Sequence, residues 1–236
     1  MNKLSPRQNG PRPLILLFDI DGTLITTGGA GRRALERAFN HRYGSTNVFD
    51  GFPFGGMTDP AIIRAGMQRL NRPYDANEQR HLLDLYVEAL ADELTKSPHR
   101  LHDGMHDAVA RSRQRANAAV GLGTGNIVEG ARKKLEPLGA YEWFSFGGFG
   151  SDHEDRAELI KKGIERGAAA LGKDRKDCRV VIIGDTPKDV EAALANGAEA
   201  VCVTTGSFTA EALHACGAHK VYANLAAPGA CDYLLG

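Results

Sequence analysis

Short apolar runs alternate with helical patterns along most of the chain. The run at 13–18 is continuously apolar, which is typical of a strand buried on both faces of a parallel sheet. Further short apolar runs predict strands at 119–123, 144–146, 180–183, 200–203 and 220–222. Helical periodicity predicts helices between them, at 127–137, 155–171, 187–196 and 208–216. This alternation predicts an α/β fold, a doubly wound parallel sheet with helices on both faces.

The segment 27–97 interrupts the alternation. It has helical patterns near 30–42, 59–70 and 77–95 and lacks a convincing strand pattern. We therefore expect an inserted all-α domain at 27–97, with the α/β core formed by 1–26 and 98–236. Such an insertion would stand over the carboxyl ends of the strands, where ligands bind in open α/β sheets.

Two aspartates follow the first predicted strand directly. Asp19 and Asp21 stand two residues apart, and in an extended chain such residues point to the same side. Gly22 then permits a tight turn. Two carboxylates this close repel each other, so a nearby cation or a raised pKa on one of them is expected.

A second acidic group, Asp185 and Asp189, follows the predicted strand at 180–183. Neighbouring parallel strands would bring Asp185 beside Asp19, giving hard oxygen ligands that suit Mg²⁺. Between them in sequence, Thr124, Gly125 and Asn126 join a strand end to a helix start, where backbone N–H groups can hold an anion. The sequence therefore predicts a phosphate site at one edge of the sheet. An ionised carboxylate needs no general base to act as a nucleophile there.

Composition narrows the class of protein. The chain has 29 Lys and Arg residues against 29 Asp and Glu residues, so it lacks the basic footprint of a nucleic-acid-binding protein. No apolar run reaches the length of a membrane span, and the N-terminal segment, expected to be a loose leader, has no apolar signal region. The four cysteines show no zinc spacing and are expected to be free thiols. We expect a cytoplasmic enzyme that acts on a small molecule.

The motifs together resemble the haloacid dehalogenase superfamily, in particular its phosphatases with a helical cap, such as the phosphoglycolate phosphatase-like group. The resemblance covers about residues 14–222, and the stretch 18–24 (FDIDGTL) matches the first motif throughout. It implies that Asp19 is the nucleophile forming an aspartyl-phosphate, and that Asp21 is the acid and base, with its carbonyl on Mg²⁺. It further implies that Asp185 binds the metal, supported by Asp189, and that Thr124 orients the phosphoryl group.

The stretch 184–189 (GDTPKD) resembles the family's fourth motif. The third motif departs from the family pattern, which usually has a lysine ahead of the helix that precedes this stretch. Arg156 stands at that position, with Lys161 and Lys162 further along the helix. We favour Arg156 as the cation that grips the phosphoryl group, although an exposed first-turn residue is an alternative. With it, the residues expected around the phosphoryl group are Gly22, Thr124, Gly125, Asn126 and Arg156.

Other polar features have plainer interpretations. The basic pairs and triplets at 32–33, 132–134 and 161–162 are expected to be solvated helix faces. The stretch 55–60 either touches the substrate or begins a helix with Asp59 as N-cap and Pro60 as first residue.

The sequence thus predicts a Mg²⁺-dependent phosphatase of small phosphorylated metabolites. A phosphomutase of the β-phosphoglucomutase type is the chemical alternative, since it shares core and cap. A non-catalytic nucleotide- or phosphate-binding protein is the alternative from another class, but it has no need of both Asp19 and Asp21.

Overall fold

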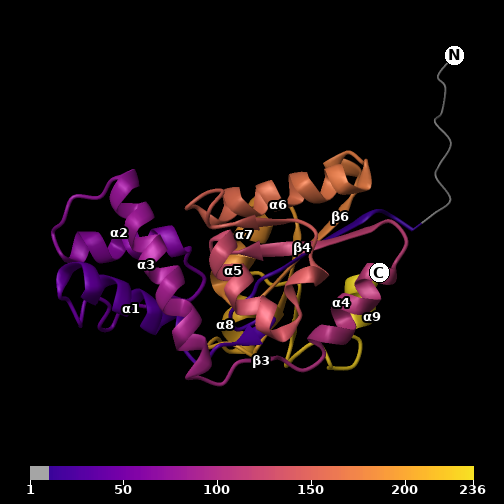
Figure 1. Cartoon of the computed structure of the whole chain (residues 1–236). Coiled ribbons are helices and arrows are strands. Elements are labelled where there is room, and N and C mark those ends of the chain that lie inside the picture. The colour runs from indigo at the N-terminus through magenta and orange to yellow at the C-terminus, as the bar shows by residue number, and fades with distance from the viewer. Residues whose placement is uncertain (1–10) are drawn as a thin grey trace, which may run out of the picture.

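A six-stranded parallel sheet forms the centre of the molecule (Figure 1) in a computed structural model that describes residues 11–236. Its strands run in the order β5-β4-β1-β6-β7-β8. They are β1 (Leu14–Phe18), β4 (Ala118–Thr124), β5 (Gly147–Phe149), β6 (Arg179–Gly184), β7 (Glu199–Val203) and β8 (Lys220–Tyr222). Each neighbouring pair is parallel, which confirms the predicted fold class. The predicted leader falls almost wholly outside the described residues.

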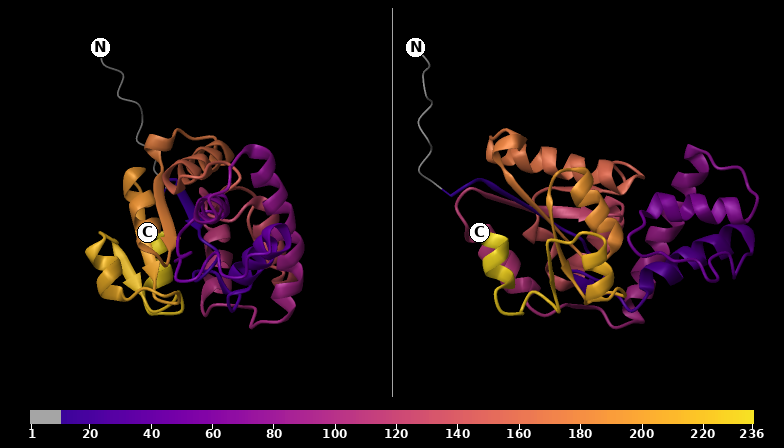
Figure 2. Two further views of the ribbon diagram at one scale, coloured as in Figure 1. Left: turned by 90° about the vertical axis from the view of Figure 1, so that its left-hand side faces the viewer. Right: turned by 180° about the vertical axis from the view of Figure 1, so that it is seen from behind.

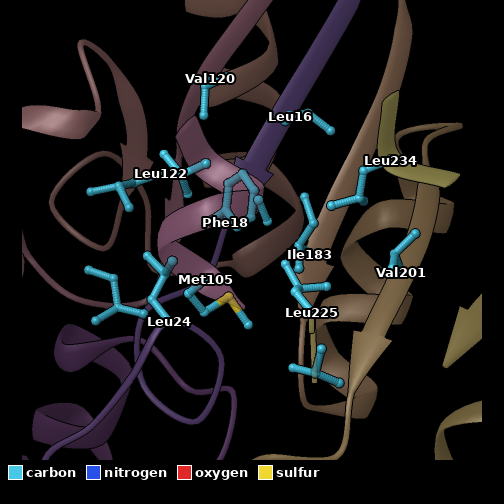
Figure 3. Packing of buried hydrophobic residues seen from close by; sticks show 14 of the residues in the cluster. Leu16, Phe18, Leu24, Met105, Val120, Leu122, Ile183, Val201, Leu225 and Leu234 are labelled. Atoms are coloured by element: carbon cyan, nitrogen blue, oxygen red, sulfur yellow. The ribbon is translucent and has the colours of Figure 1, made fainter. Parts of the chain in front are cut away.

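The first strand divides its side chains between two hydrophobic clusters. Leu14, Leu16 and Phe18 enter one cluster, and Ile15 and Leu17 enter the other. The side chains divide in this way because successive residues of a strand point to opposite faces of the sheet. All five are fully buried. Figure 3 shows the first cluster, with Leu16 and Phe18 surrounded by side chains from neighbouring strands and from the helices on that face. The continuous apolar run therefore reflects burial from both sides.

Helices cover both faces of the sheet. The cluster around Phe18 is completed by α4 (Met105–Gln114), α5 (Val128–Leu135) and α9 (Ala230–Leu235). The opposite face carries α6 (Arg156–Leu171), α7 (Pro187–Ala195) and α8 (Ala210–Ala215). Asp155 caps α6 by accepting the N–H groups of Ala157 and Glu158 at 2.8 and 3.3 Å, and Gly172 ends the helix with φ of 59°.

Three of the helices between β1 and β4 gather at one end of the molecule (Figures 1 and 2). They are α1 (Ala30–Tyr43), α2 (Asp59–Arg69) and α3 (Ala76–Thr95). Their buried side chains form a third cluster, joined by Ile127 from the core. The chain enters and leaves this region through β2 (Ile25–Thr26) and β3 (Arg100–Leu101), which pair antiparallel. Both crossings therefore lie side by side.

The strand expected at 144–146 is wrong. Those residues precede the real strand, β5. Phe144 and Phe146 are apolar because they pack into the hydrophobic clusters on opposite faces of the sheet. The strand itself begins with two glycines, and a Cβ on Gly148 would stand 1.9 Å from the carbonyl oxygen of Leu159 in α6. This close approach of helix to strand excludes the side chains that usually mark a strand.

Among residues 11–236, the remaining helical turns are three 3-10 segments, Glu136–Leu138, Tyr141–Trp143 and Arg175–Asp177. None of the helices formed by residues 11–236 has the length and apolar character needed to span a bilayer. All four cysteines are free, two buried and two half-buried, which confirms the expectation for the thiols.

Candidate active site

The central strands deliver the predicted site residues to one edge of the sheet. Phe18 at the end of β1 pairs with Leu122 of β4 and Ile183 of β6. Asp19 follows β1, Thr124 is the last residue of β4, and Asp185 follows β6. Because the chain passes from β1 to β4 on one side and β6 lies on the other, this edge is the switch point of the sheet.

Three carboxylates form a buried cluster at this edge. Asp19, Asp185 and Asp189 each offer an oxygen atom, and these atoms lie within 4.8 Å of one another. The three residues are 5%, 4% and 1% exposed. Burial raises the pKa of Asp19 to about 6, although the charge of Arg156 opposes the rise. Burial also raises the pKa of Asp185 well above its usual range, and Asp189 and Asp19 add to the effect.

Two glycines shape the pocket around Asp185. A Cβ on Gly22 would stand 2.3 Å from Oδ2 of Asp185, and one on Gly206 would stand 1.7 Å from the same atom. Thr23 donates its hydroxyl to the other oxygen, Oδ1, at 2.9 Å. Gly206 lies in the loop after β7, which carries no motif that the sequence analysis recognised. The oxygen-rich site fits a hard divalent cation, since such a cation would relieve the repulsion between Asp19 and Asp185.

Arg156 reaches into the site from the first position of α6. Its Nη2 lies 3.1 Å from Oδ2 of Asp19 and donates to Oδ1 of Asp189 at 2.5 Å. Its Nη1 donates to the carbonyl of Gly56, in the loop before α2, at 3.2 Å. Lys161 and Lys162 instead form exposed ion pairs within α6. The structure therefore brings Arg156, and neither lysine, to the aspartates.

Asp189 has both carboxylate oxygens engaged. Arg156 occupies Oδ1, and Oδ2 accepts the N–H and hydroxyl of Thr186 at 3.1 and 2.7 Å. Thr186 in turn caps α7, so Asp189 fixes the start of that helix and the direction of the guanidinium. This arrangement suits the supporting role predicted for Asp189.

Asp21 belongs to a second polar network, built on Lys134. Nζ of Lys134 donates to Oδ2 of Asp21 and to Oδ1 of Asn126, both at 2.6 Å. Asn126 donates Nδ2 to the same Asp21 oxygen at 2.8 Å and to Oγ1 of Thr124 at 2.9 Å. Burial would raise the pKa of Asp21, but Lys134 and Asn126 outweigh it, and the pKa lies below its usual value.

The expectation that Lys134 belongs to a solvated face is wrong. The residue is buried, with 3% of its surface exposed, whereas the neighbouring Lys133 is exposed. Lys134 stands four residues after Gly130 and three after Ala131, both of them buried, so it shares the inward face of α5. Helical spacing was therefore a signal that could have identified it.

Three N–H groups at the start of α5, those of Asn126, Ile127 and Val128, have partners in the protein. The amide of Asn126 donates to Oγ1 of Thr124 at 3.3 Å, and that of Val128 donates to Ser151 at 3.0 Å. The amide of Ile127 donates to the buried carboxylate of Asp59 at 2.9 Å.

Asp59 is not the N-cap of α2. The N-cap is Thr58, whose hydroxyl accepts the N–H of Ala61 at 3.2 Å. The carbonyl of Gly125 accepts the N–H of Asp59 at 2.8 Å, so this loop faces α2 as well as the site.

A cavity of about 330 Å³ lies between the sheet edge and the three inserted helices. Its core side includes Asp19, Asp21, Asn126, Lys134 and Arg156. The inserted segment contributes a largely apolar wall: Arg32, Leu35, Phe54, Met57, Ile62 and Tyr86. Arg32 was expected in solvent, but it donates to the carbonyls of Phe49 and Phe52 and lies 3.9 Å above the ring of Phe54.

The fold and the site together describe a doubly wound α/β protein with a buried acidic cluster and a buried arginine at the carboxyl ends of its strands. The chain is a member of the haloacid dehalogenase-like hydrolase family, whose model matches residues 14–197. The resemblance identified from the motifs is thereby confirmed at the level of the superfamily.

Solved structures of low sequence identity share the fold. A predicted phosphatase from Clostridium acetobutylicum is 19% identical, with a TM-score of 0.65 over 89% of this chain and 94% of that one. CbbY from Rhodobacter sphaeroides, solved in complex with phosphate, is 16% identical, with a TM-score of 0.68 over 91% and 96%. A candidate β-phosphoglucomutase from Bacteroides vulgatus is 16% identical, with a TM-score of 0.64 over 95% and 89%. A search of curated protein sequences found no match.

Proposed function

We propose that this protein is a Mg²⁺-dependent phosphatase of small phosphorylated metabolites that acts through an aspartyl-phosphate. The observation that carries the proposal is the placement of Asp19, which lines the cavity, contacts Arg156 and shares an acidic cluster with Asp185. A carboxylate in that position has both a route to substrate and a cation to hold the group that it attacks.

In the proposed reaction, a carboxylate oxygen of Asp19 attacks the phosphorus atom and the ester bond to the leaving oxygen breaks. Asp21, which also lines the cavity, gives a proton to that oxygen and later takes one from the attacking water. Arg156, which Asp189 holds in place, binds the phosphoryl oxygens, because its positive charge attracts their negative charge.

The residues that would hold Mg²⁺ are Asp19, Asp185 and the main-chain carbonyl of Asp21, with Asp189 supporting them. When bound, the ion neutralises negative charge between nucleophile and phosphoryl group. Burial, and to a smaller extent the neighbouring carboxylates, raises the pKa values of Asp19 and Asp185, and a cation held between them would favour their charged forms.

We further propose that residues 27–97 form a cap that closes over the substrate. The cavity walls supplied by this segment support the assignment, as does the bond between Gly56 and Arg156 across the junction. Closure would exclude water from the first half of the reaction. A cavity of about 330 Å³ suits a small metabolite.

A phosphomutase is the second candidate, supported by structural likeness to a candidate β-phosphoglucomutase. The two functions differ in product, since a phosphatase releases inorganic phosphate and a mutase returns an isomerised sugar phosphate.

The test is a panel of phosphorylated metabolites, phosphoglycolate and hexose phosphates included, assayed with Mg²⁺ for free phosphate. The proposal expects phosphate release that stops on chelation with EDTA and returns with added Mg²⁺. It also expects Asp19→Asn to reduce the rate by about a thousandfold or more, because the amide is a poor nucleophile. Isomerised product without phosphate would favour the mutase, and turnover in EDTA would refute the metal assignment.

A further inference from the structure

Lys134 has a buried ammonium group, which is fixed between Asp21, after β1, and Asn126, after β4. Its two short hydrogen bonds go to Oδ2 of Asp21 and Oδ1 of Asn126. Placing an ammonium group out of water costs several kcal/mol unless charge and hydrogen bonds compensate. An apolar residue would serve packing better on this face of α5, where Ala131 and Leu135 are fully buried. The ammonium group therefore calls for a role beyond packing.

Lys134 orients one carboxylate without covering it. Both donors, Lys134 and Asn126, bind the same atom of Asp21, Oδ2. Among the described residues, Oδ1 has no hydrogen-bond partner, and 42% of the side chain is exposed on the cavity. One oxygen of Asp21 is thus anchored and the other is left for a ligand.

Lys134 also lies close to the inserted segment, near both of its crossings to the core. Nε2 of His99, which lies just before β3, donates to the carbonyl of Lys134 at 2.6 Å. On the other crossing, a Cβ on Gly31 at the start of α1 would stand 3.3 Å from Nζ and 3.7 Å from Cε of Lys134. Movement of the inserted helices therefore bears directly on the group that holds Asp21.

We infer that Lys134 is a positioning residue for proton transfer by Asp21, and that it couples this step to the seating of the inserted helices. The inference rests on the proposed phosphatase function.

As the bond from Asp19 to phosphorus forms, the bond to the leaving oxygen breaks, and that oxygen takes a proton that Asp21 has first taken up from solvent. Asp21 becomes negative next to the ammonium group of Lys134, which stabilises the charge. Water then attacks phosphorus and gives its proton to Asp21, and the bond to Asp19 breaks with its electron pair returning to Asp19.

The test compares Lys134→Met with Lys133→Met, its exposed neighbour, on two substrates that differ in their need for a proton. Phenyl phosphate has a poor leaving group that requires proton transfer, whereas dinitrophenyl phosphate has one that departs as an anion. For Lys134→Met we expect kcat to fall by about a hundredfold on phenyl phosphate and by less than about threefold on dinitrophenyl phosphate. Lys133→Met should match the unmodified protein on both.

A second variant keeps the ammonium group and moves it. Gly31→Ala places a methyl group against Nζ in an otherwise favourable helix position, so the protein should remain folded. We expect a smaller loss with the same bias toward phenyl phosphate. Circular dichroism and thermal unfolding establish that each variant is folded.

Equal losses on both substrates, or a rise in KM with unchanged kcat, would overturn the inference, because they indicate general damage or direct substrate binding. Failure of the proposed function has a separate signature, since the unmodified protein would then release phosphate from neither substrate.

Discussion

Asp59 provides a test of the junction between α2 and the core by titration of a single buried group. Its side chain accepts the N–H of Ile127, and the residue is 6% exposed. Burial raises the pKa of Asp59 from 3.8 to about 6, although Lys134 and the Ile127 amide oppose the rise. Since each pKa unit corresponds to about 1.4 kcal/mol, the rise of about two units corresponds to about 3 kcal/mol.

The sign follows from proton binding. Between the unfolded and folded pKa values, the folded protein retains a proton on Asp59 that the unfolded chain has released. Stability is therefore lost as pH rises from about 4 to about 6, and the full cost of the buried charge is present above that window. Asp59→Asn removes the charge while its amide oxygen still accepts the Ile127 N–H. The stability of this variant relative to the parent should increase by about 1.5 kcal/mol between about pH 5 and pH 8.

Urea denaturation across that pH range measures the difference, with the slope of the transition checked for constancy. Asp84→Asn on the exposed face of the neighbouring α3 is the matched control and should show no such trend. A stability difference between Asp59→Asn and the parent that stays constant or decreases from pH 5 to pH 8 would refute the reasoning. It would mean that the surroundings do not raise the pKa of Asp59.

Two further predictions concern the site. Arg156→Ala should lower kcat/KM by about a hundredfold or more, because it removes the cation beside Asp19, whereas the exposed Lys161→Ala should change it by less than about twofold; similar losses in steady-state assays would mean that Arg156 does not hold the phosphoryl group. Gly206→Ala places a methyl group 1.7 Å from Oδ2 of Asp185 and should raise the Mg²⁺ concentration needed for half-maximal rate by about tenfold or more. An unchanged Mg²⁺ titration would show that Asp185 does not bind the ion.

Much of the architecture could be predicted because its cause is local. The apolar run at 14–18 is buried on both faces, and its parallel pairing with β6 places Asp19 near Asp185. Parallel strands end at a common edge, so acids that follow two neighbouring strands meet there. Motif spacing and strand pattern therefore sufficed for the acidic cluster.

The residues that sequence reasoning missed owe their place to tertiary packing. Lys134 was assigned to solvent because lysines are seldom buried, yet Asp21 and Asn126 compensate its charge. Gly206 follows β7 in a loop without a recognised motif, and only its approach to Asp185 reveals its importance. The glycines of β5 concealed a strand, since a close helix contact replaced the expected side chains.

The walls and the floor of the cavity come from different parts of the chain. Leu35, Phe54 and Ile62 belong to the segment between the two crossings, and this segment has its own hydrophobic cluster. Asp19 and Asp185 follow strands whose packing does not depend on those side chains. Substitutions in the inserted helices can therefore reshape the cavity wall while the aspartates keep their positions, so under the proposed function substrate selectivity and reactivity can evolve separately.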